Sequence, residues 1–519
     1  MMYIIKVVFL GFLSWRQMSF VWGVQTELSK KLFVGYLRLP YSFHLQHNSA
    51  QLIHNISYGT SLFSQNTLTA STTLIIETLA FISVTTLLII NEPYGTLLIV
   101  SLLGLIGLVL SRSIRNHTLY WGECYQKHEK MLIQYIQQGL GAIKDVKLLG
   151  CEDYLLRQYQ EHSINRAKFA RNKATVDNLP PFLIEMLAVL GLAVLVVTMI
   201  WQNKTKEEML PVLGLFAAGS FRLMPSINRI LGAIQNIRFS LPIVDILYKE
   251  ICIIDREDKE KFLQKKNPSN KEFSNVITID KLCFGYPNTK VFTLKDISLS
   301  IRYGATIGFV GSSGAGKSTL VNIILGLFAP NKGTVNIDGA NVENNLRGWQ
   351  NQIGYVSQSI YLIDDTLRRN IAFGLPEEDI NEVALEQAVR AAQLEQFIKD
   401  LPLGMNTIVG ERGVRLSGGQ CQRIGIARAL YHDPKILVLD EATNSLDIIT
   451  ERSVMDVVYD LKGSKTIIIV AHRLSTVERC DHVFHIENGR IVRDGKPSVI
   501  LKTIVEHNNF KPNTAAEIK

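Results

Sequence analysis

The sequence contains 519 residues, of which 47% are hydrophobic and 20% charged, and its formal net charge at pH 7 is +8. This length exceeds a single domain of roughly 100–200 residues, so we expect at least two units. The positive charge does not indicate a nucleic-acid partner, because Lys and Arg are concentrated in loops that flank apolar segments, as in membrane proteins. The six cysteines lack C-x-x-C spacing, which argues against a zinc site and a disulfide framework.

The first apolar segment runs from Met1 to about Val24. A cleaved signal peptide fits it poorly, because only Lys6 lies near its start and no A-x-A cleavage site follows. We interpret it as a membrane helix that runs inward. A basic segment follows, and Phe43–Ile53 is then expected to lie in a cytoplasmic loop.

Four further apolar runs predict two helical hairpins. The first joins Leu74–Ile90 to Thr96–Leu110 through NEPYG, and the second joins Phe182–Trp201 to about Leu210–Leu231. Each run approaches the ~20 residues that a helix needs to cross about 30 Å of hydrocarbon. Together with the first helix, these runs predict five membrane spans.

The loop from Arg112 to Lys173 is rich in Lys and Arg, whereas NEPYG contains neither. The excess of basic residues places this loop in the cytoplasm, and five spans then place Met1 outside. The length of the loop predicts two helices that extend beyond the bilayer. A turn is expected near Leu149–Tyr154, where KLLGCEDY can form a short helix that contacts the other domain.

The composition changes after the last apolar run. The segment Asp255–Ser274 is highly charged and is interpreted as a solvated linker. From about residue 275, short apolar runs alternate with Gly, Asp and Lys, as in an α/β domain. We therefore expect a transmembrane domain at 1–254, a linker at 255–274 and a second domain at 275–519.

A phosphate-binding loop lies in the second domain. Residues 310–320 read VGSSGAGKSTL, a match to G-x-x-x-x-G-K-S that lies between a predicted strand and a predicted helix. In this pattern the glycines let backbone N–H groups surround phosphate oxygens, Lys317 reaches the terminal phosphates and Ser318 ligates Mg²⁺. ATP and Mg²⁺ are therefore the expected cofactors.

A buried apolar strand, ILVLDE, ends in two carboxylates. Such a pair is often only a solvated strand end, but the phosphate-binding loop gives it a specific interpretation. We expect Asp440 to hold Mg²⁺ through water and Glu441 to orient and polarise the attacking water.

Leu416–Gln420 reads LSGGQ, and CQRIGIARAL follows it. Other P-loop families lack this motif, so the chain resembles ABC transporters, and in particular ABC exporter half-transporters. The resemblance implies a multidomain fold, with an all-α exporter transmembrane domain followed by an α/β P-loop ATPase domain that contains a helical subdomain. It also implies six spans for each half, so a first helix is expected to be missing here.

The resemblance extends to several residues of the ATPase. It implies that Tyr286 stacks on adenine, that Gln358 senses Mg²⁺ and the membrane domain, and that His472 contacts the γ-phosphate. The signature would close on ATP held by the opposite subunit, so a homodimer with two competent sites is expected; VGERG at Val409–Gly413 resembles a loop that couples to the membrane domain. The nucleotide-contacting residues implied in this way are Tyr286, Gly311, Ser312, Ser313, Gly314, Ala315, Gly316, Lys317, Ser318, Thr319, Ser417, Gly418, Gly419, Gln420 and Asp447.

Two arginines in the last span bear on the cargo. Arg222 and Arg229 are seven residues apart and share one helix face, and Arg222 would lie roughly 18 Å deep at 1.5 Å per residue. An arginine at that depth is costly unless it faces water, a partner or an anion. Each is therefore a candidate for binding a diphosphate, or else an arginine that snorkels or pairs with Glu185 or Glu77.

The membrane half also resembles bacterial lipid-linked oligosaccharide flippases of the PglK type, through RLMPSINRI, KLLGCEDY and LPPFLIEM. The resemblance implies ATP-driven movement of a polyprenyl-diphosphate-linked oligosaccharide from the cytoplasmic to the outer leaflet of the bacterial inner membrane. The ATPase domain would then lie in the cytoplasm. Pro181 stands where another basic residue is expected, which is a departure from the pattern of that site.

Other functions share the ATPase motifs. The principal alternative is an ABC exporter of phospholipid, lipopolysaccharide precursor or amphipathic drug, which substrate-stimulated ATPase activity would distinguish. A soluble ABC ATPase acting on DNA or ribosomes is excluded by the long apolar spans. An ATP-gated channel or regulator would differ in showing passive conductance instead of ATP-dependent transport.

Overall fold

The structure is a computed structural model that describes residues 1–91, 93–201, 206–264, 272–287, 289, 291–410, 413–414, 416–442, 448–471 and 473–509. Contacts divide the chain into two compact units. The first contains residues 1–39 and 43–260, and the second contains 40–42 and 261–519.

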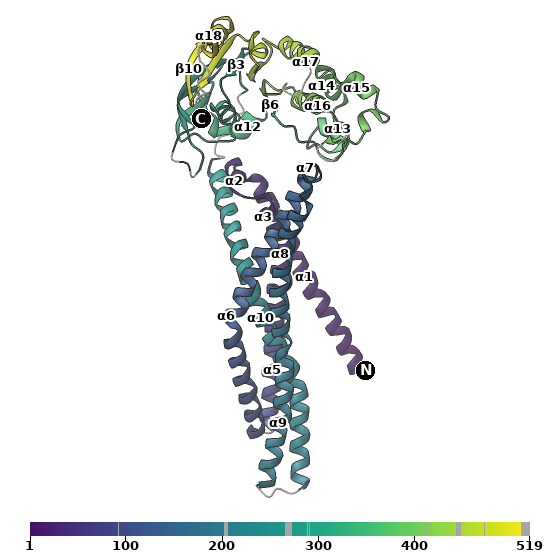
Figure 1. Cartoon of the computed structure of the whole chain (residues 1–519). Helices are drawn as coiled ribbons and strands as arrows, with labels where there is room; N and C mark the ends of the chain where they lie inside the picture. Colours follow the sequence, from purple (N-terminus) through teal and green to yellow (C-terminus); the bar gives the residue numbers. More distant parts are fainter. Residues whose placement is uncertain are drawn as a thin grey trace. The chain divides into compact units, whose positions relative to one another are not determined.

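The first unit, over its described residues, is built from helices; most of the long ones run side by side, whereas the N-terminal end of the chain diverges from them in the view of Figure 1. The elements in this part of the chain are α1 (Met2–Arg38), α2 (Tyr41–Gln46), α3 (Ser49–His54), the π-helical η1 (Asn55–Gly59), α4 (Thr60–Leu62), the π-helical η2 (Phe63–Leu68), α5 (Thr69–Asn91), α6 (Pro93–Gly141), α7 (Ile143–Leu149), α8 (Glu152–Asp177), α9 (Leu179–Trp201) and α10 (Lys206–Gln264).

Among the described residues, three helical stretches are long and apolar enough to cross a membrane: Tyr3–Arg38, Ser49–Ile90 and Glu152–Trp201. In the most apolar window of Ser49–Ile90, only 6% of the residues are buried inside the chain. Apolar side chains that the protein itself leaves uncovered require lipid or another protein surface. The other two predicted spans lie within α6 and α10, where the chain is helical as expected.

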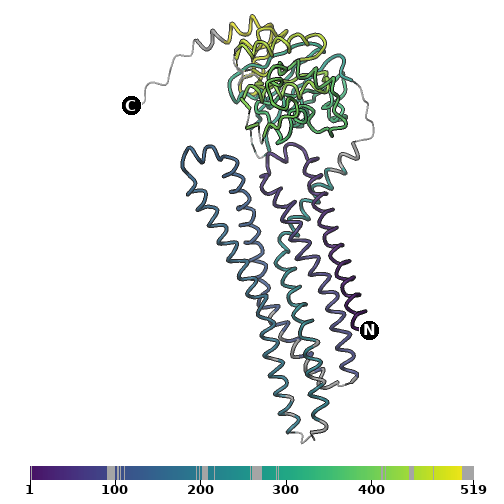
Figure 2. The backbone as a smooth tube through the Cα atoms, turned by 90° about the vertical axis from the view of Figure 1, so that its right-hand side faces the viewer, coloured from purple at the N-terminus to yellow at the C-terminus, as the bar shows by residue number. Residues whose placement is uncertain are grey.

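The helical hairpin predicted for the loop from Arg112 to Lys173 is present. Helices α6 and α8 pack against each other and are joined through α7, as the blue part of the tube in Figure 2 shows. Gly150 follows α7 with φ of 61°, a left-handed conformation that glycine adopts without strain and that ends a helix. The short helix expected within KLLGCEDY thus ends at Leu149, and α8 begins at Glu152.

The expected linker differs from the structure over its first half. Helix α10 continues through Asp255 to Gln264, so these ten predicted linker positions are helical. Their mixed Asp, Glu, Lys and Arg content suits an exposed helix as well as a loop, because such long side chains lose little freedom in a helix. Lys31 of α1 also pairs with Asp255 at 2.8 Å. Residues 265–271 lie outside the described part.

The second unit contains two sheets surrounded by helices. A four-stranded antiparallel sheet has the order β2-β1-β4-β5, and a six-stranded sheet has the order β10-β9-β3-β8-β7-β6, parallel except for β10. The strands are β1 (Val276–Phe284), β2 (Leu294–Arg302), β3 (Thr306–Val310), β4 (Lys332–Ile337), β5 (Ala340–Asn341), β6 (Ile353–Val356), β7 (Ile436–Asp440), β8 (Thr466–Val470), β9 (His482–Glu487) and β10 (Arg490–Gly495).

The helices of this unit include a compact group between β6 and β7, which forms the expected helical subdomain. That group runs from α13 to α16. The helices of the whole unit, over its described residues, are α11 (Lys317–Ile324), η3 (Val342–Asn345), α12 (Leu346–Gln350), α13 (Leu367–Ile371), η4 (Glu377–Asp379), α14 (Glu382–Ala391), α15 (Glu395–Lys399), η5 (Gly404–Asn406), α16 (Gly418–Leu430), α17 (Ile448–Asp460), η7 (Leu474–Val477) and α18 (Pro497–Asn509).

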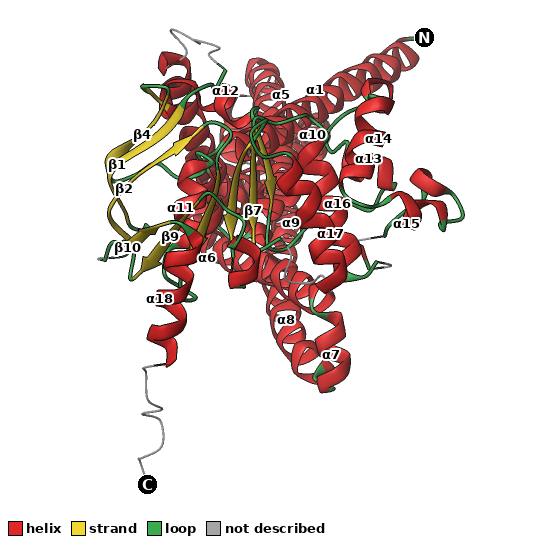
Figure 3. Cartoon of the chain, turned by 90° about the horizontal axis from the view of Figure 1, so that it is seen from above, coloured by secondary structure: helices red, strands yellow, loops and turns green. Residues whose placement is uncertain are grey.

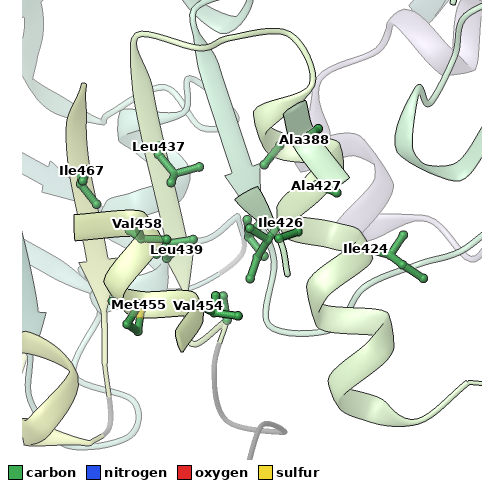
Figure 4. Packing of buried hydrophobic residues seen from close by; sticks show 14 of the residues in the cluster. Ala388, Ile424, Ile426, Ala427, Leu437, Leu439, Val454, Met455, Val458 and Ile467 are labelled. Atoms are coloured by element: carbon green, nitrogen blue, oxygen red, sulfur yellow. The ribbon is translucent and has the colours of Figure 1, made fainter. Parts of the chain in front are cut away.

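The central strands of the six-stranded sheet are buried on both faces. Along β7, Ile436 and Val438 join a core with α11 and the antiparallel sheet, whereas Leu437 and Leu439 join a core with α16 and α17. Successive side chains of a strand point to opposite faces, so a continuous apolar run is needed here. Figure 3 shows α11 and α16 on either side of β7, and Figure 4 shows the core beneath α16 and α17.

Candidate ATP-binding and hydrolysis site

The phosphate-binding loop, Gly311–Gly316, joins the buried strand β3 to α11. Gly311 has φ of 150°, and a Cβ there would lie 2.1 Å from the Ile486 carbonyl oxygen. Gly316, with φ of 105°, precedes the first residue of α11. These positions require glycine, and the resulting loop brings backbone N–H groups to a helix N-terminus, where anions bind favourably.

Lys317 lies at the start of α11, and its side chain is folded over this loop. Its Nζ donates to the carbonyl oxygens of Gly311 at 2.8 Å and Ser312 at 3.0 Å. Burial lowers the pKa of Lys317, although Glu441 and Asp440 oppose this effect. The ammonium group is thus held where the loop curves, next to the negative charge of the two carboxylates.

Asp440, the last residue of β7, lies beside the phosphate-binding loop. The hydroxyl of Ser318 donates to Asp440 Oδ1 at 3.3 Å, and that of Tyr355 to Asp440 Oδ2 at 3.5 Å. Burial and the neighbouring Glu441 charge raise the pKa of Asp440. A serine hydroxyl and a carboxylate form an all-oxygen set of the kind that Mg²⁺ prefers, so these residues fit that ion.

Glu441 follows directly and is buried, with 8% of its surface exposed. Its φ of 53° is unusual for a residue other than glycine, and its N–H donates to the Val470 carbonyl oxygen at 3.0 Å. Gln358 donates through Nε2 to Glu441 Oε2 at 2.7 Å. The structure therefore brings Gln358 into contact with Glu441, which directly follows Asp440, while the roles expected of these residues stay predictions.

Tyr286 lies beside the helix that follows the phosphate-binding loop. Its hydroxyl forms a hydrogen bond with Thr319 Oγ1 at 3.0 Å, and its ring packs edge-on against Phe328 at 5.7 Å. This position agrees with the expected place for an adenine-stacking residue next to the loop. Stacking itself stays a prediction.

The signature motif begins α16. Ser417 caps the helix by accepting from the Gln420 N–H, and the Gln420 side chain accepts from the Ser417 N–H in return. This reciprocal cap uses the N–H groups of Ser417 and Gln420. The N–H groups of Gly418 and Gly419 also lie at the helix N-terminus, and these glycines have no side chain to cover them. Because α16 packs on the opposite face of the sheet from α11, the two nucleotide-contacting regions of one chain lie on different faces.

Several predicted residues lie outside the described part. Asp447, His472 and two residues of VGERG, Glu411 and Arg412, belong to this group. The backbone of Arg222 is helical within α10, but its side chain also lies outside the described part. Their roles stay predictions.

Arg229 forms an ion pair in the structure, and its candidate role in cargo binding stays a prediction. Its Nε lies 2.7 Å from Glu77 Oε1, and Glu77 is only 13% exposed. The sequence had left a pairing with Glu77 as the alternative interpretation, and this is the arrangement that the structure has. The pair is neutral overall, which lowers the cost of an arginine within an apolar span.

Tyr355 was missed by the sequence interpretation. It lies on β6, and burial raises the pKa of its phenol above the ordinary value, so the hydroxyl stays protonated and donates to Asp440. The sequence motif GYVSQ contains Tyr355, but only the pairing of β6 with β7 aligns Tyr355 with Val438, two residues before Asp440. Adjacency in the sheet was the missing information.

Comparisons with known families agree with this geometry. Residues 1–211 match the ABC transporter transmembrane region, and residues 294–444 match the ABC transporter family. Among solved structures, a bacterial Atm1-family ABC exporter with ATP bound shares the fold, with a TM-score of 0.83 and 23% sequence identity. The match covers 98% of this chain and 89% of that one.

Curated relatives span both halves of the chain. The "ATP-dependent lipid A-core flippase" of Alkalilimnicola ehrlichii is 29% identical over 495 residues, covering 93% of this chain and 80% of the relative. The protein of the same name from Burkholderia thailandensis is 32% identical over 413 residues, covering 78% and 67%. The chain therefore belongs to the ABC transporters, as a half-transporter that joins a transmembrane region and an ATP-hydrolysing ABC domain in one polypeptide.

Proposed function

We propose that the chain is one half of a homodimeric exporter that uses ATP to flip a lipopolysaccharide precursor of the lipid A-core class. One observation carries this proposal: a relative with that name matches over 495 residues, through the membrane helices as well as the ATPase. An ATPase alone says nothing about cargo, because the same domain serves many substrates. The sequence had offered this cargo as an alternative to a polyprenyl-diphosphate-linked oligosaccharide.

The residues at the ATP site have distinct roles in this proposal. Gly311–Gly316 and Lys317 bind the phosphates of ATP, while Ser318, Asp440 and Gln358 hold Mg²⁺, which neutralises charge on the phosphates when bound. Glu441 accepts a hydrogen bond from the attacking water, which orients it, and takes up its proton as general base. The hydrogen bond from Gln358 to Glu441 restrains this carboxylate before nucleotide binds.

A second copy of the chain completes each site. The capped start of α16 offers N–H groups suited to a phosphate, but it lies on the opposite face of the sheet from α11. A head-to-tail pair of ATPase domains resolves this separation, because each signature then faces the partner's phosphate-binding loop. In this proposal the protein lies in a bacterial inner membrane, with the ATPase in the cytoplasm and Arg112–Lys173 on the same side.

A polyprenyl-diphosphate glycan is the second candidate cargo. It is favoured by the resemblance of RLMPSINRI, KLLGCEDY and LPPFLIEM to flippases of such glycans, while Arg222, deep in a span, suits any anionic group. Lipid A-core and a polyprenyl diphosphate both carry phosphate, so Arg222 serves either cargo. The choice between them requires a direct comparison.

Reconstituted full-length protein can make that comparison. Proteoliposomes with outward-facing ATPase domains receive either fluorescent lipid A-core or a fluorescent polyprenyl-diphosphate oligosaccharide, and the loss of externally accessible label is followed with and without ATP. We expect ATP-dependent loss for lipid A-core, abolished in Glu441→Gln. Arg222→Ala should reduce transport far more than Arg222→Lys, while both retain ATP hydrolysis.

Two results would contradict the proposal. If only the polyprenyl-diphosphate glycan were transported, this glycan would be the cargo and lipid A-core would not. Unaltered ATP hydrolysis in Glu441→Gln would refute the assigned role of that residue, whatever the cargo.

A further inference from the structure

An arginine on the signature helix bonds to a distant segment of the same domain. Arg428 lies near the end of α16, and its guanidinium donates to three oxygens. Nε donates to the Asn370 carbonyl oxygen at 2.8 Å, Nη1 to the Tyr361 carbonyl oxygen at 2.9 Å, and Nη2 to Asn370 Oδ1 at 3.2 Å. Its Cζ also lies 4.8 Å from the centre of the Phe373 ring, within range of a cation–π contact.

The segment that Arg428 holds begins at Gln358. Tyr361 comes three residues after Gln358, and Ile363 comes two residues later. Ile363 exchanges two backbone hydrogen bonds with the fully buried side chain of Asn370, both at 3.0 Å. Arg428 and Asn370 together therefore fix the chain immediately after the residue that contacts Glu441.

A second contact joins α16 to the same segment. A Cβ at Gly425 would lie 1.9 Å from Ile360 Cδ1, so the helix backbone approaches Ile360 closely at that point. Gly425 and Arg428 are three residues apart and lie on one face of the helix. One face of α16 thus holds Ile360 and Tyr361, while the other end of the helix carries the cap at Ser417, roughly 16 Å away along the axis.

We propose that Arg428 is a positioning residue that links Gln358, at one ATP site, to the signature motif that this chain offers to the partner's ATP site. A guanidinium suits this role, because its donors are held in a rigid plane that fixes the directions of all three bonds, whereas an ammonium group is a compact charge on a flexible stem. When the segment after Gln358 shifts, α16 then moves with it as a rigid helix. The inference rests on the proposed homodimer, in which the signature of one chain serves the site of the other.

Full-length protein in lipid nanodiscs provides the test, with kcat measured alongside the Kd of a non-hydrolysable ATP analogue. Arg428→Met should lower kcat about tenfold, the kinetic equivalent of losing one hydrogen bond to a charged group. The Kd should change by no more than about twofold, because the phosphate-binding loop is untouched. Arg428→Lys should lie between, and Arg390→Gln, in an exposed ion pair with Glu395, should match wild type.

A double-mutant cycle with Gln358→Ala separates coupling from loss of stability. If Arg428 acts through the segment after Gln358, Arg428→Met should lower the residual kcat of Gln358→Ala by less than about twofold. The inference would be overturned if Arg428→Met lowered kcat tenfold in the Gln358→Ala background as well. An unchanged kcat in Arg428→Met alone would also overturn it. Should Arg428→Met fail to fold, Arg428→Lys replaces it in the cycle. A wild-type protein without ATP hydrolysis would instead contradict the proposed function.

Discussion

The charged residues of the ATPase unit and those of the helical unit are compensated to different extents. At the ATP site, Asp440 and Glu441 are adjacent and buried, and the negative charge of Glu441 helps to raise the pKa of Asp440. In the helical unit, Arg229 is neutralised by Glu77 at 2.7 Å. The two adjacent carboxylates favour the binding of a cation, whereas the charges of Arg229 and Glu77 already balance each other. An anionic cargo would have to compete with Glu77 for Arg229.

The largest expected effect lies at the ATP site. Glu441→Gln should lower kcat about 10²-fold to 10³-fold, because an amide cannot accept a proton from water. Binding of ATP should persist, since the phosphate-binding loop and Lys317 are unaltered. ATP hydrolysis and equilibrium binding of a fluorescent ATP analogue measure the two quantities. Near-normal turnover would contradict the contrast between the two units, because the buried Glu441 carboxylate would then have no catalytic role.

The second prediction concerns the neutral pair of the helical unit. Arg229→Gln or Glu77→Gln alone should lower the thermal midpoint of this unit by about 4–8 °C, because each leaves one charge unpaired in an apolar setting. The double variant should be more stable than either single variant. Tryptophan fluorescence suits the measurement, since the helical unit contains Trp15, Trp22, Trp121 and Trp201.

Retention of the wild-type midpoint in both single variants would show that the pair contributes nothing. If Arg229→Gln also lost transport while Glu77→Gln retained it, the result would support the candidate role of Arg229 in cargo binding.

The smallest effect is expected at Asp440. Without nucleotide, Asp440→Asn should raise the thermal midpoint of the ATPase unit by about 2 °C at neutral pH, because it removes a buried charge next to Glu441. Folding raises the pKa of Asp440, so its charge does not destabilise the wild type below the ordinary aspartate value of about 4. The destabilisation grows as the pH rises from there to the raised pKa and is constant above it. The difference between variant and wild type should therefore vanish near pH 4. Calorimetry of the full chain across pH measures it, and a lower midpoint for Asp440→Asn at neutral pH would contradict it.

Much of the architecture could be predicted from local patterns. Long apolar runs located the helical hairpins, and the continuous apolar run before Asp440 identified a strand buried on both faces. The phosphate-binding loop and LSGGQ identified the ATPase, because their glycines and polar residues meet requirements that act within a few residues. The end of α10 was missed, since its charged residues suit a helix and a loop equally well.

Long-range contacts could not be predicted in this way. The sequence named two possible partners for Arg229, and only the packing of α5 against α10 selected Glu77. Tyr355 acts on Asp440 because β6 and β7 are neighbours in the sheet, and Arg428 reaches Tyr361 because α16 crosses the segment after Gln358.

The sequence by itself therefore determined the class of the protein, the helical and α/β character of its two units, and the loop that is expected to bind phosphate. Each of these depends on residue spacing and local backbone conformation. Tertiary structure alone decided that Arg229 is neutralised, that Asp440 is held by Ser318 and Tyr355, and that the signature helix is bonded to the segment of Gln358. These contacts join residues from 67 to 152 positions apart, and their distances depend on how whole helices and strands pack.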